Sequence, residues 1–400
     1  MKEIFIIHAH WNNRGDEAAV RAMMDELLEC DEDIHLSLQI NSNELHEIEG
    51  LEEQGINVLH NRFPKKKDLP EVMAILASKG RITFSARGKE FVKTLKNADM
   101  VVHAPGGPSI GDIYKNAELP YLMRFLMAKR LGKKYFFYAP SMGPFTGVRN
   151  SIRKRVLKNA SAVILREKIS ENHVKNFVPD VKTLTTLDSA FQHDVDIEKN
   201  EKLLDNYTEL KCFLNKYDKC IGITITDLQW NPLYSGKDEI KNNIRESFEN
   251  FIKYLKEQGF GVVFVPQLFG SANDRDYMAS FALDNAFVVD DTYDCYFQQY
   301  LISKLYAVVG MRYHSNIFSC KMKIPFISVS YEQKMKGFME SQKLEKYCIN
   351  INDLSFEILK EKFDLLLSEY DEYRNILVEK SPELKRKAHR TTDILLSKLK

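Results

Sequence analysis

The sequence predicts an α/β protein of two Rossmann-like domains, each built around a mostly parallel sheet. Four hundred residues exceed what one hydrophobic core usually fills, so two domains of roughly 150–200 residues are expected. Short apolar runs alternate with helical stretches, which is typical of βαβ units. This alternation stops in the polar, charged segment 193–218 and then restarts, so we interpret that segment as a linker.

The N-terminal Rossmann-like domain is predicted to span residues 1–192. Its first strand candidate, residues 4–8, carries no charge, and apolar positions share one face of the helix that begins near Asp16. The domain's predicted strands are 4–8, 35–40, 56–60, 100–104, 135–139 and 162–165, with helices near 44–54, 70–79, 88–97, 114–131, 149–159 and 168–177.

The C-terminal Rossmann-like domain is predicted to span residues 219–385. A very basic C-terminal helix, 386–400, follows it, and the sequence does not decide which domain this helix packs against. The domain's predicted strands are 220–225, 262–266, 287–289, 307–310 and 326–329, with helices at 237–258, 274–284 and 294–304.

Composition excludes several classes of function. With 57 basic and 56 acidic residues, the chain has no basic excess with which to neutralise a nucleic-acid backbone. No window approaches the ~18 apolar residues of a membrane span, and residues 4–7 are too short for the apolar region of a signal peptide. The six scattered cysteines show no CxxC or metal-type spacing. We therefore expect a cytoplasmic protein that binds no nucleic acid and has no integral membrane segment.

One run of three lysines raises the possibility of contact with a membrane surface. Lys65, Lys66 and Lys67 could touch an anionic membrane at its inner face. Anionic membrane surfaces are usually bound by clusters of 4–8 basic residues, so the expected alternative is that these lysines lie in a solvated loop. Peripheral contact at the inner face of the cytoplasmic membrane stays open at this point.

Ligands of open α/β sheets bind beyond the carboxyl ends of the strands, so the loops there are the candidate sites. The first, residues 12–17, contains Asn13, Gly15 and Asp16 but matches neither a Walker A loop nor a GxGxxG fingerprint. Gly15 permits a tight turn, and the N–H groups of the following helix could hold an anion. The alternative is that Asp16 merely complements the helix dipole.

Two further loops follow strands of the same domain. The loop after 100–104 contains Gly106, Gly107 and Ser109, whose glycines allow a ligand close to the backbone. The loop after 135–139 contains Ser141. Each of these loops could be an ordinary turn. Because three such loops lie at equivalent strand ends of one domain, they favour a ligand-binding site.

Cationic residues at strand ends predict anion binding in a catalytic cleft between the domains. Arg166 follows one strand, and its alternative role is a salt bridge to Glu167 or another acid. Arg312 and His314 follow residues 307–310. If that segment is extended, both side chains share a face, which places a cation beside a general acid or base. The alternative for His314 is a helix cap. Lys334 could add positive charge.

Histidines raise the possibility of a metal site. His8, His10 and His103 lie near predicted strand ends and could meet around Asp112. Their spacing does not match a zinc site, so we expect no metal.

Taken together, these motifs resemble the polysaccharide pyruvyl transferase family. The matching pieces occur in the family's order over residues 13 to about 340. They are Asn13-x-Gly15-Asp16-Glu17-Ala18, Gly106-Gly107, Gly143-Pro144-Phe145, Arg166-Glu167-x-x-Ser170, Asp188-x-Ala190-Phe191, Pro266-Gln267, Arg312-x-His314 and Tyr331-x-x-Lys334.

The resemblance implies a fold similar to B-type glycosyltransferases and the co-substrate phosphoenolpyruvate, without a cofactor. It implies transfer of pyruvate onto two hydroxyls of a lipid-linked or nucleotide-linked sugar, in surface-polysaccharide (capsule or exopolysaccharide) biosynthesis. Arg166 and Arg312 would bind the donor, together with Lys334, and His314 would be catalytic. The loop residues Asn13, Gly15, Asp16, Gly106, Gly107, Ser109, Ser141 and Gln267 would line the cleft.

Two alternatives remain at this point. A nucleotide-sugar-dependent glycosyltransferase could use the same architecture, because fold does not determine function. A non-catalytic scaffolding protein is the second, and the presence of Arg166, Arg312 and His314 argues against it.

Overall fold

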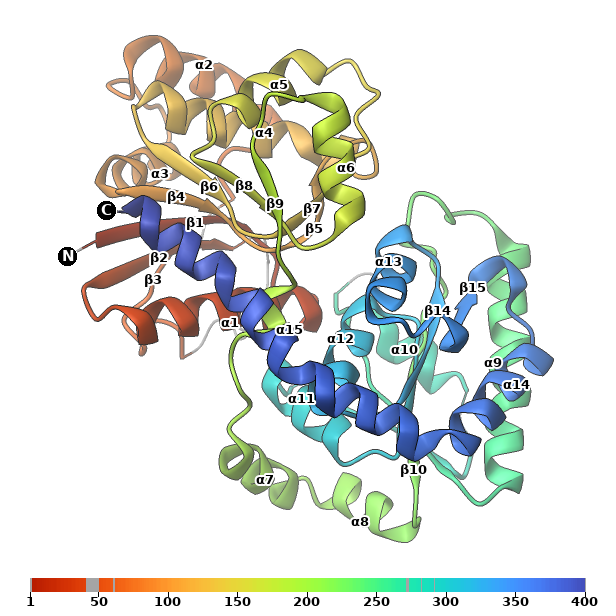
Figure 1. Ribbon diagram of the computed structural model, residues 1–400. Helices are drawn as coiled ribbons and strands as arrows, with labels where there is room; N and C mark the ends of the chain where they lie inside the picture. The colour runs from red at the N-terminus through yellow and green to blue at the C-terminus, as the bar shows by residue number, and fades with distance from the viewer. Residues whose placement is uncertain are drawn as a thin grey trace. The chain divides into compact units, whose positions relative to one another are not determined.

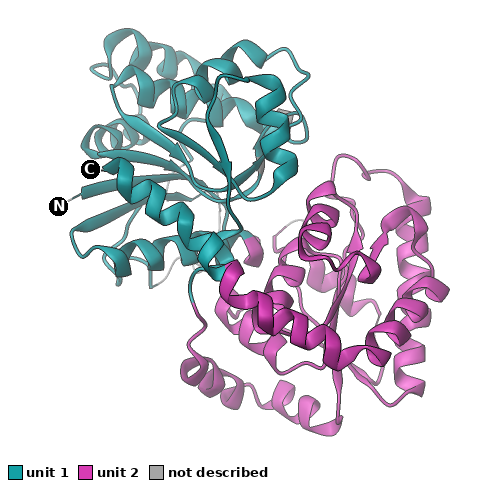
Figure 2. Cartoon of the chain, viewed as in Figure 1, with its two compact units in different colours: residues 1–11, 16–193, 385–400 teal, residues 12–15, 194–384 magenta. Residues whose placement is uncertain are grey.

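The computed structural model describes residues 2–40, 50–59, 62–270, 273–281, 283–290 and 292–399. The chain divides into two compact units, coloured separately in Figure 2. Each unit is an α/β structure around its own parallel sheet, which confirms the predicted fold class. Unit 1 comprises Met1–Trp11, Asp16–His193 and Lys385–Lys400, and unit 2 comprises Asn12–Gly15 and Asp194–Leu384.

Unit 1 is built around a seven-stranded sheet in the order β3-β2-β1-β4-β6-β8-β9 (Figure 1). Side chains alternate along β1 because successive residues of a strand face opposite sides of the sheet. Phe5 and Ile7 pack into the core beneath α2 to α6, whereas Ile4 and Ile6 join the core on the α1 face. The strands are β1 (Lys2–Ala9), β2 (Ile34–Ile40), β3 (Asn57–Leu59), β4 (Met100–His103), β6 (Lys134–Phe137), β8 (Ala162–Leu165) and β9 (Thr183–Thr185), and the helices are α1 (Arg14–Cys30), α2 (Leu69–Ser78), α3 (Ala86–Asn97), α4 (Lys115–Arg130), α5 (Asn150–Lys158) and α6 (Lys168–Phe177).

The segments expected as loops after β4 and β6 form a small parallel sheet instead. Its strands are β5 (Gly106–Ile110) and β7 (Pro140–Met142). The two segments come very close just beyond it, where Gly111 has φ +145° and an added Cβ would lie 2.8 Å from the backbone of Gly143. Glycine is therefore required here by backbone contact as well as by conformation.

Unit 2 is built around a six-stranded sheet in the order β12-β11-β10-β13-β14-β15. The direction in which strands are added reverses between β10 and β13, and this is where a ligand site is expected in such sheets. The strands are β10 (Cys220–Thr224), β11 (Gly261–Phe264), β12 (Ala286–Val288), β13 (Ala307–Gly310), β14 (Phe326–Ser330) and β15 (Cys348–Asn350), and the helices include α9 (Asp238–Glu257), α10 (Asp274–Ala279), α11 (Cys295–Ser303), α12 (Tyr313–Met322), α13 (Gln333–Gln342) and α14 (Phe356–Ser368).

The segment 193–218, expected as a linker, carries two helices. These are α7 (Ile197–Asn206) and α8 (Thr208–Lys216), and residues from Asp194 onward belong to unit 2. Leu204 and Leu210 are buried, so a polar segment with few apolar positions still packs by one face of each helix.

The C-terminal helix is longer than the sequence predicts. α15 (Tyr370–Leu399) has 30 residues, of which those up to Leu384 belong to unit 2 and the rest to unit 1. Within unit 1, Leu395 joins the core on the α1 face, and Gln192 Nε2 donates to Ala388 O at 2.8 Å. The structure therefore packs the basic end of the chain on the N-terminal sheet.

Two other predicted elements fall partly on residues that the structure does not describe. Most of the predicted helix 44–54 and the end of the predicted strand 56–60 lie outside the described residues. The short strands β9 and β15 had no recognised signal. Among the described helices, none combines the length and apolarity that crossing a bilayer requires.

Candidate active site

The candidate site of unit 2 lies where β10 and β13 end side by side. Arg312 follows β13 after one intervening residue, Met311, with an extended backbone of φ −89° and ψ 135°, and is the N-cap residue of α12. The neighbouring strand end holds it in place, because Met311 N donates to Thr224 O at 2.8 Å and Arg312 N donates to Thr224 Oγ1 at 3.3 Å. Local strand geometry thus positions the guanidinium at the switch point of the sheet.

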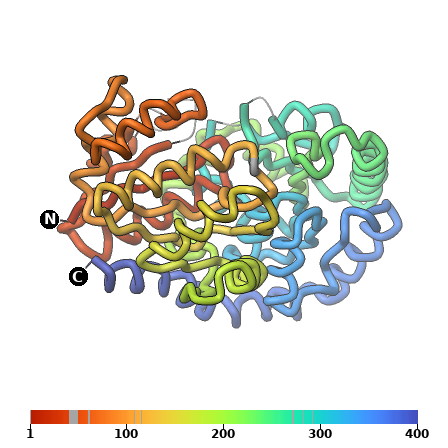
Figure 3. The backbone as a smooth tube through the Cα atoms, turned by 90° about the horizontal axis from the view of Figure 1, so that it is seen from above, coloured from red at the N-terminus to blue at the C-terminus, as the bar shows by residue number. Residues whose placement is uncertain are grey.

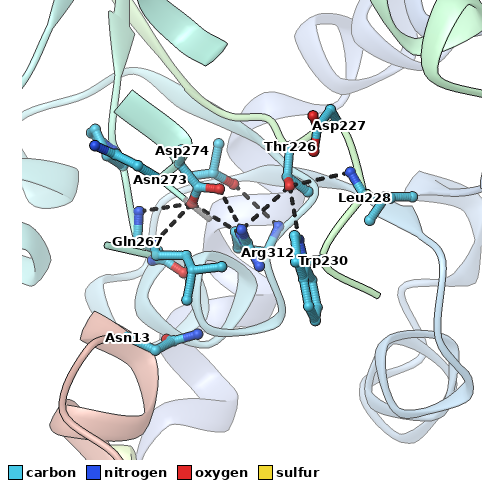
Figure 4. Close-up of polar contacts among 12 residues, drawn as sticks. Asn13, Thr226, Asp227, Leu228, Trp230, Gln267, Asn273, Asp274 and Arg312 are labelled. Carbon is cyan, nitrogen blue, oxygen red and sulfur yellow. Dashed lines mark hydrogen bonds and ion pairs between the residues drawn. The ribbon is translucent and has the colours of Figure 1, made fainter. Parts of the chain in front are cut away.

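The Arg312 side chain is buried and forms an ion pair (Figure 4). Its Nε donates to Asp274 Oδ2 at 3.0 Å, and its Nη2 donates to Asp274 Oδ1 and to Thr226 Oγ1. The guanidinium carbon lies 4.7 Å from the centre of the Trp230 ring, within range of a cation–π interaction. Burial alone would lower the Arg312 pKa, but Asp274 and Tyr331 together outweigh burial and raise it. The side chain therefore stays cationic.

Asp274 accepts hydrogen bonds from the surrounding backbone, and the sequence did not predict it as a site residue. It is the first residue of α10, and its Oδ2 also accepts from the backbone N–H groups of Gln267 and Leu268, at 3.1 and 2.9 Å. The only local signal is Asn273, whose side chain caps α10 by accepting from Arg275 N. That pattern predicts a helix start and says nothing about an arginine 38 positions away.

The expectation that Arg312 and His314 lie on one extended edge is wrong. Helix α12 begins at Tyr313, so His314 lies in its first turn. Ser315 explains the turn, because its backbone N–H and its hydroxyl both donate to Arg312 O, at 3.2 and 2.6 Å. His314 is 6% exposed, so its imidazole is nearly buried, two residues after the buried cation in the sequence.

The segment Asn12–Gly15 belongs to the same unit as His314. It pairs with the loop after β11 through an antiparallel bridge between Asn13 and Leu268. Arg14 N donates to Gln267 O, and Phe269 N donates to Asn12 O, both at 2.9 Å. The candidate residues Asn13 and Gln267 are therefore brought together by backbone pairing.

Gly15 has a different role from the predicted tight turn. It already lies in α1, and a Cβ at this position would be 2.0 Å from His314 Nδ1. Its backbone N–H donates to Asn13 Oδ1 at 2.8 Å. The absence of a side chain at Gly15 is what gives the imidazole its space.

Lys334 is also in unit 2, in the first turn of α13. Its ammonium pairs with Glu332 at 2.7 Å and lies 5.6 Å from the centre of the Tyr313 ring. Tyr313 directly precedes His314, so this cation adjoins the same helix start.

Arg166 lies in unit 1 at the carboxyl end of β8. Its Nη1 pairs with Asp188 at 2.7 Å, its Nε donates to Ser141 Oγ at 2.9 Å, and Glu167 is 3.3 Å away. The salt bridge considered as an alternative for Arg166 is thus present, with two carboxylates. Its role in donor binding stays a prediction, as does the cleft between the domains.

The remaining loop candidates gather at the carboxyl ends of β1 and β4 in unit 1. A Cβ at Gly106 would lie 3.1 Å from Asp16 Oδ1, so these residues are neighbours. Ser109 Oγ lies 2.7 Å from His103 Nε2, while His103 Nδ1 lies 2.6 Å from Ala104 O. Because a carbonyl only accepts, Nδ1 carries the proton and the serine hydroxyl donates to Nε2. Gly107, on the same strand, is partly exposed.

His8, His10 and His103 do come together, but not around Asp112. The His8 and His103 ring centres are 4.6 Å apart, and His10 Nε2 lies 3.1 Å from Tyr121 Oη. Asp112 instead pairs with Arg153 at 2.8 Å. Among the described residues, no cluster of three His, Cys, Asp or Glu side chains is arranged to hold a metal ion.

We expect this histidine cluster to make the protein acid-sensitive. Burial, and then neighbouring basic groups, hold the pKa of His8 well below 6.5, and burial lowers the pKa of His103 to about 4. The unfolded chain therefore takes up protons as pH falls from 6.5 towards 4, and the folded state loses stability over that window. For His103 alone the loss is about 3 kcal/mol.

Urea unfolding at several pH values measures this effect. His8 has a left-handed backbone, φ 71°, which asparagine tolerates. A His8→Asn variant should show a flatter decline of the unfolding free energy between pH 6.5 and 4 than the wild type. A His35→Asn variant, at an exposed histidine, should keep the wild-type slope. Equal slopes for His8→Asn and wild type would contradict the prediction.

Over nearly its whole length, the chain is similar to solved structures of an epimerase and two transferases. It is 13% identical to UDP-GlcNAc 2-epimerase from Neisseria meningitidis, with a TM-score of 0.60 over 99% of this chain and 100% of that one. It is 12% identical to a glycosyltransferase from Rickettsia africae, with a TM-score of 0.60 over 100% and 98%. The ADP-heptose heptosyltransferase II of E. coli is 12% identical, with a TM-score of 0.51 over 93% and 100%. At these identities the likeness shows a shared fold, that of B-type glycosyltransferases.

The family is identified by a different comparison. A family model described as polysaccharide pyruvyl transferase matches residues 13–333. This range begins at the Asn13 motif and ends within the Tyr331-x-x-Lys334 motif, so it contains Arg166, Arg312 and His314. The chain belongs to the polysaccharide pyruvyl transferase family.

Proposed function

We propose that this protein transfers pyruvate from phosphoenolpyruvate onto two hydroxyls of one sugar, forming a cyclic ketal. The observation that carries the proposal is that the start of α12, at the switch point of unit 2, supplies both a cation and an imidazole. Arg312 is a buried, charged guanidinium, and His314, two residues later, is a nearly buried imidazole. A small donor that carries both phosphate and carboxylate requires the first group, and proton transfer requires the second.

The chemistry requires one proton transfer to a donor carbon and the loss of a proton from each of two hydroxyls. A sugar hydroxyl loses its proton as it adds to C2 of phosphoenolpyruvate, and a proton goes to the methylene carbon C3. The C2–O bond to phosphate then breaks, and phosphate leaves. A second hydroxyl attacks C2 and loses its proton, which closes the ketal. We assign to His314 either the donation of the first proton or the acceptance of one from a hydroxyl.

Asp274 supports this assignment by fixing the donor-binding cation. Because Asp274 engages Nε and Nη2, the plane of the Arg312 guanidinium is held in one orientation. Trp230 stacks against the same group. A cation that is positioned in advance loses less entropy when it binds an anion.

Ligand-dependent stabilisation is the first test of the proposed donor. Phosphoenolpyruvate at about a hundred times its dissociation constant should add about 2.7 kcal/mol to the unfolding free energy, which a melting curve detects. NAD and NADP should give no shift, since the chain lacks a GxGxxG loop. A larger shift with a UDP or GDP sugar would contradict the proposal and favour a glycosyltransferase.

Product analysis is the decisive test of the reaction. The purified protein, phosphoenolpyruvate and a panel of lipid-linked and nucleotide-linked sugars should release phosphate and yield a ketal methyl signal by NMR. We expect a 4,6-ketal on a surface-polysaccharide precursor. Phosphate release without a ketal signal would contradict pyruvyl transfer.

A further inference from the structure

Exposed apolar side chains concentrate on α2 and the segment after it in unit 1. Leu69, Met73, Ile82 and Phe84 are 45%, 57%, 52% and 67% exposed. We call these four residues the α2 patch. The other strongly exposed large apolar residues of the described chain are scattered in the sequence, at Val148, Ile197, Leu233 and Val378. Clustered exposure of this kind marks an interaction surface.

The α2 patch is held in place by a buried carboxylate. Glu71, 6% exposed, accepts hydrogen bonds from Phe84 N at 2.7 Å, from Ser85 N at 2.9 Å and from Ser85 Oγ at 2.8 Å. A Cβ at Gly88 would lie 2.2 Å from Glu71 Oε1, so the start of α3 closes over the same group. The segment carrying Ile82 and Phe84 is therefore tied to the first turn of α2, and the outward position of Phe84 is built into the fold.

The exposed charges nearest the α2 patch in the sequence have one sign. Both carboxylates between positions 64 and 87, Asp68 and Glu71, are buried, and the first exposed carboxylate after the patch is Glu90, beside Lys89. Asp68 accepts from Lys65 N at 2.8 Å and pairs with Arg87 at 3.1 Å. The exposed charges of this stretch are therefore cationic. They are Lys65, Lys66, Lys67, Lys79 and Arg81, which we call the basic rim.

We propose that the α2 patch and its basic rim dock on the surface of an anionic phospholipid bilayer. Apolar side chains beside a cluster of lysines are the pattern of interfacial membrane binding: the former enter the boundary between head groups and acyl chains, and the latter pair with phosphates. The run 65–67 alone falls short of the 4–8 basic residues such surfaces require, but Lys79 and Arg81 bring the exposed basic residues of this stretch to five. Figures 1 and 3 show α2 along the edge of unit 1.

Vesicle co-sedimentation of the full chain tests this inference. Vesicles with equal parts of phosphatidylcholine and phosphatidylglycerol should bind the protein, and vesicles of phosphatidylcholine alone should not. A triple Lys65→Gln, Lys66→Gln, Lys67→Gln variant should lower partitioning by about fivefold per lysine, about 100-fold together. A Met73→Ser, Phe84→Ser variant should also release the protein from the anionic vesicles.

Two control variants test whether a loss of vesicle binding is specific to the α2 patch and its basic rim. The control for charge is Lys199→Gln, Lys202→Gln, Lys211→Gln, three exposed lysines of α7 and α8. The control for apolar exposure is Leu233→Ser, Val378→Ser, at 52% and 50% exposure. Both should bind like the wild type, and all variants should keep the wild-type melting temperature.

Three results would overturn the proposal. These are equal binding to neutral vesicles, unchanged binding by both α2 variants, and a changed mass of the lipid-free protein when the α2 patch is altered. The last result, by analytical ultracentrifugation, would make the patch a contact between protein chains. Because the readout is lipid binding, the result does not depend on whether pyruvyl transfer is correct.

Discussion

Replacing His314 with alanine is expected to lower turnover by about 10²–10⁴-fold, the usual contribution of a general acid or base. The fold should survive, because His314 lies in the first turn of α12 beside Gly15 and outside the strands of the sheet. The measurement is the rate of phosphate release at saturating phosphoenolpyruvate and sugar, together with the melting temperature.

Two further variants make this result specific. Gly15→Ala should also reduce turnover, because the new methyl group would occupy the space of the imidazole ring and displace it. His35→Ala, at an exposed histidine of β2, should leave turnover unchanged. If His314→Ala matched the wild type, the catalytic assignment would be wrong even though the family membership stands.

Replacing Asp274 with asparagine is expected to destabilise the protein by about 3–5 kcal/mol, the usual cost of leaving a buried charge without its partner. The side chains of Asp274 and Arg312 are 1% and 4% exposed, so water cannot replace the lost carboxylate. The guanidinium also loses its fixed orientation, so phosphoenolpyruvate should bind more weakly. Urea unfolding and titration of the donor against the melting temperature measure the two effects.

The same helix supplies the control for this prediction. Asp276→Asn, at an exposed position of α10, should change neither stability nor donor binding. Arg312→Lys should fail to restore donor binding fully, because one ammonium lacks the paired donors of a guanidinium. Wild-type stability and donor affinity in Asp274→Asn would show that the ion pair does not position Arg312.

Regular secondary structure was predictable wherever burial imposed a pattern. The strands 162–165 and 307–310 were predicted with the bounds that β8 and β13 have. Fully buried parallel strands must be continuous apolar runs, so the signal is local and strong. The strands β5 and β7 had no such signal, because their pairing depends on two glycine-containing segments meeting across the fold. A polar composition similarly concealed α7 and α8, each of which buries few apolar side chains.

The sequence by itself determined the fold class and the family, and it supplied Arg312 and His314 as candidate groups, because apolar periodicity and ordered motifs are local properties of the chain. Only the tertiary structure decided how those groups are held. Asp274 and Trp230 reach Arg312 from positions 38 and 82 residues earlier, and Gly15 meets His314 from the other end of the chain. Contacts between distant positions leave no local pattern in one sequence, so these pairings become visible only when the strands that carry them lie side by side.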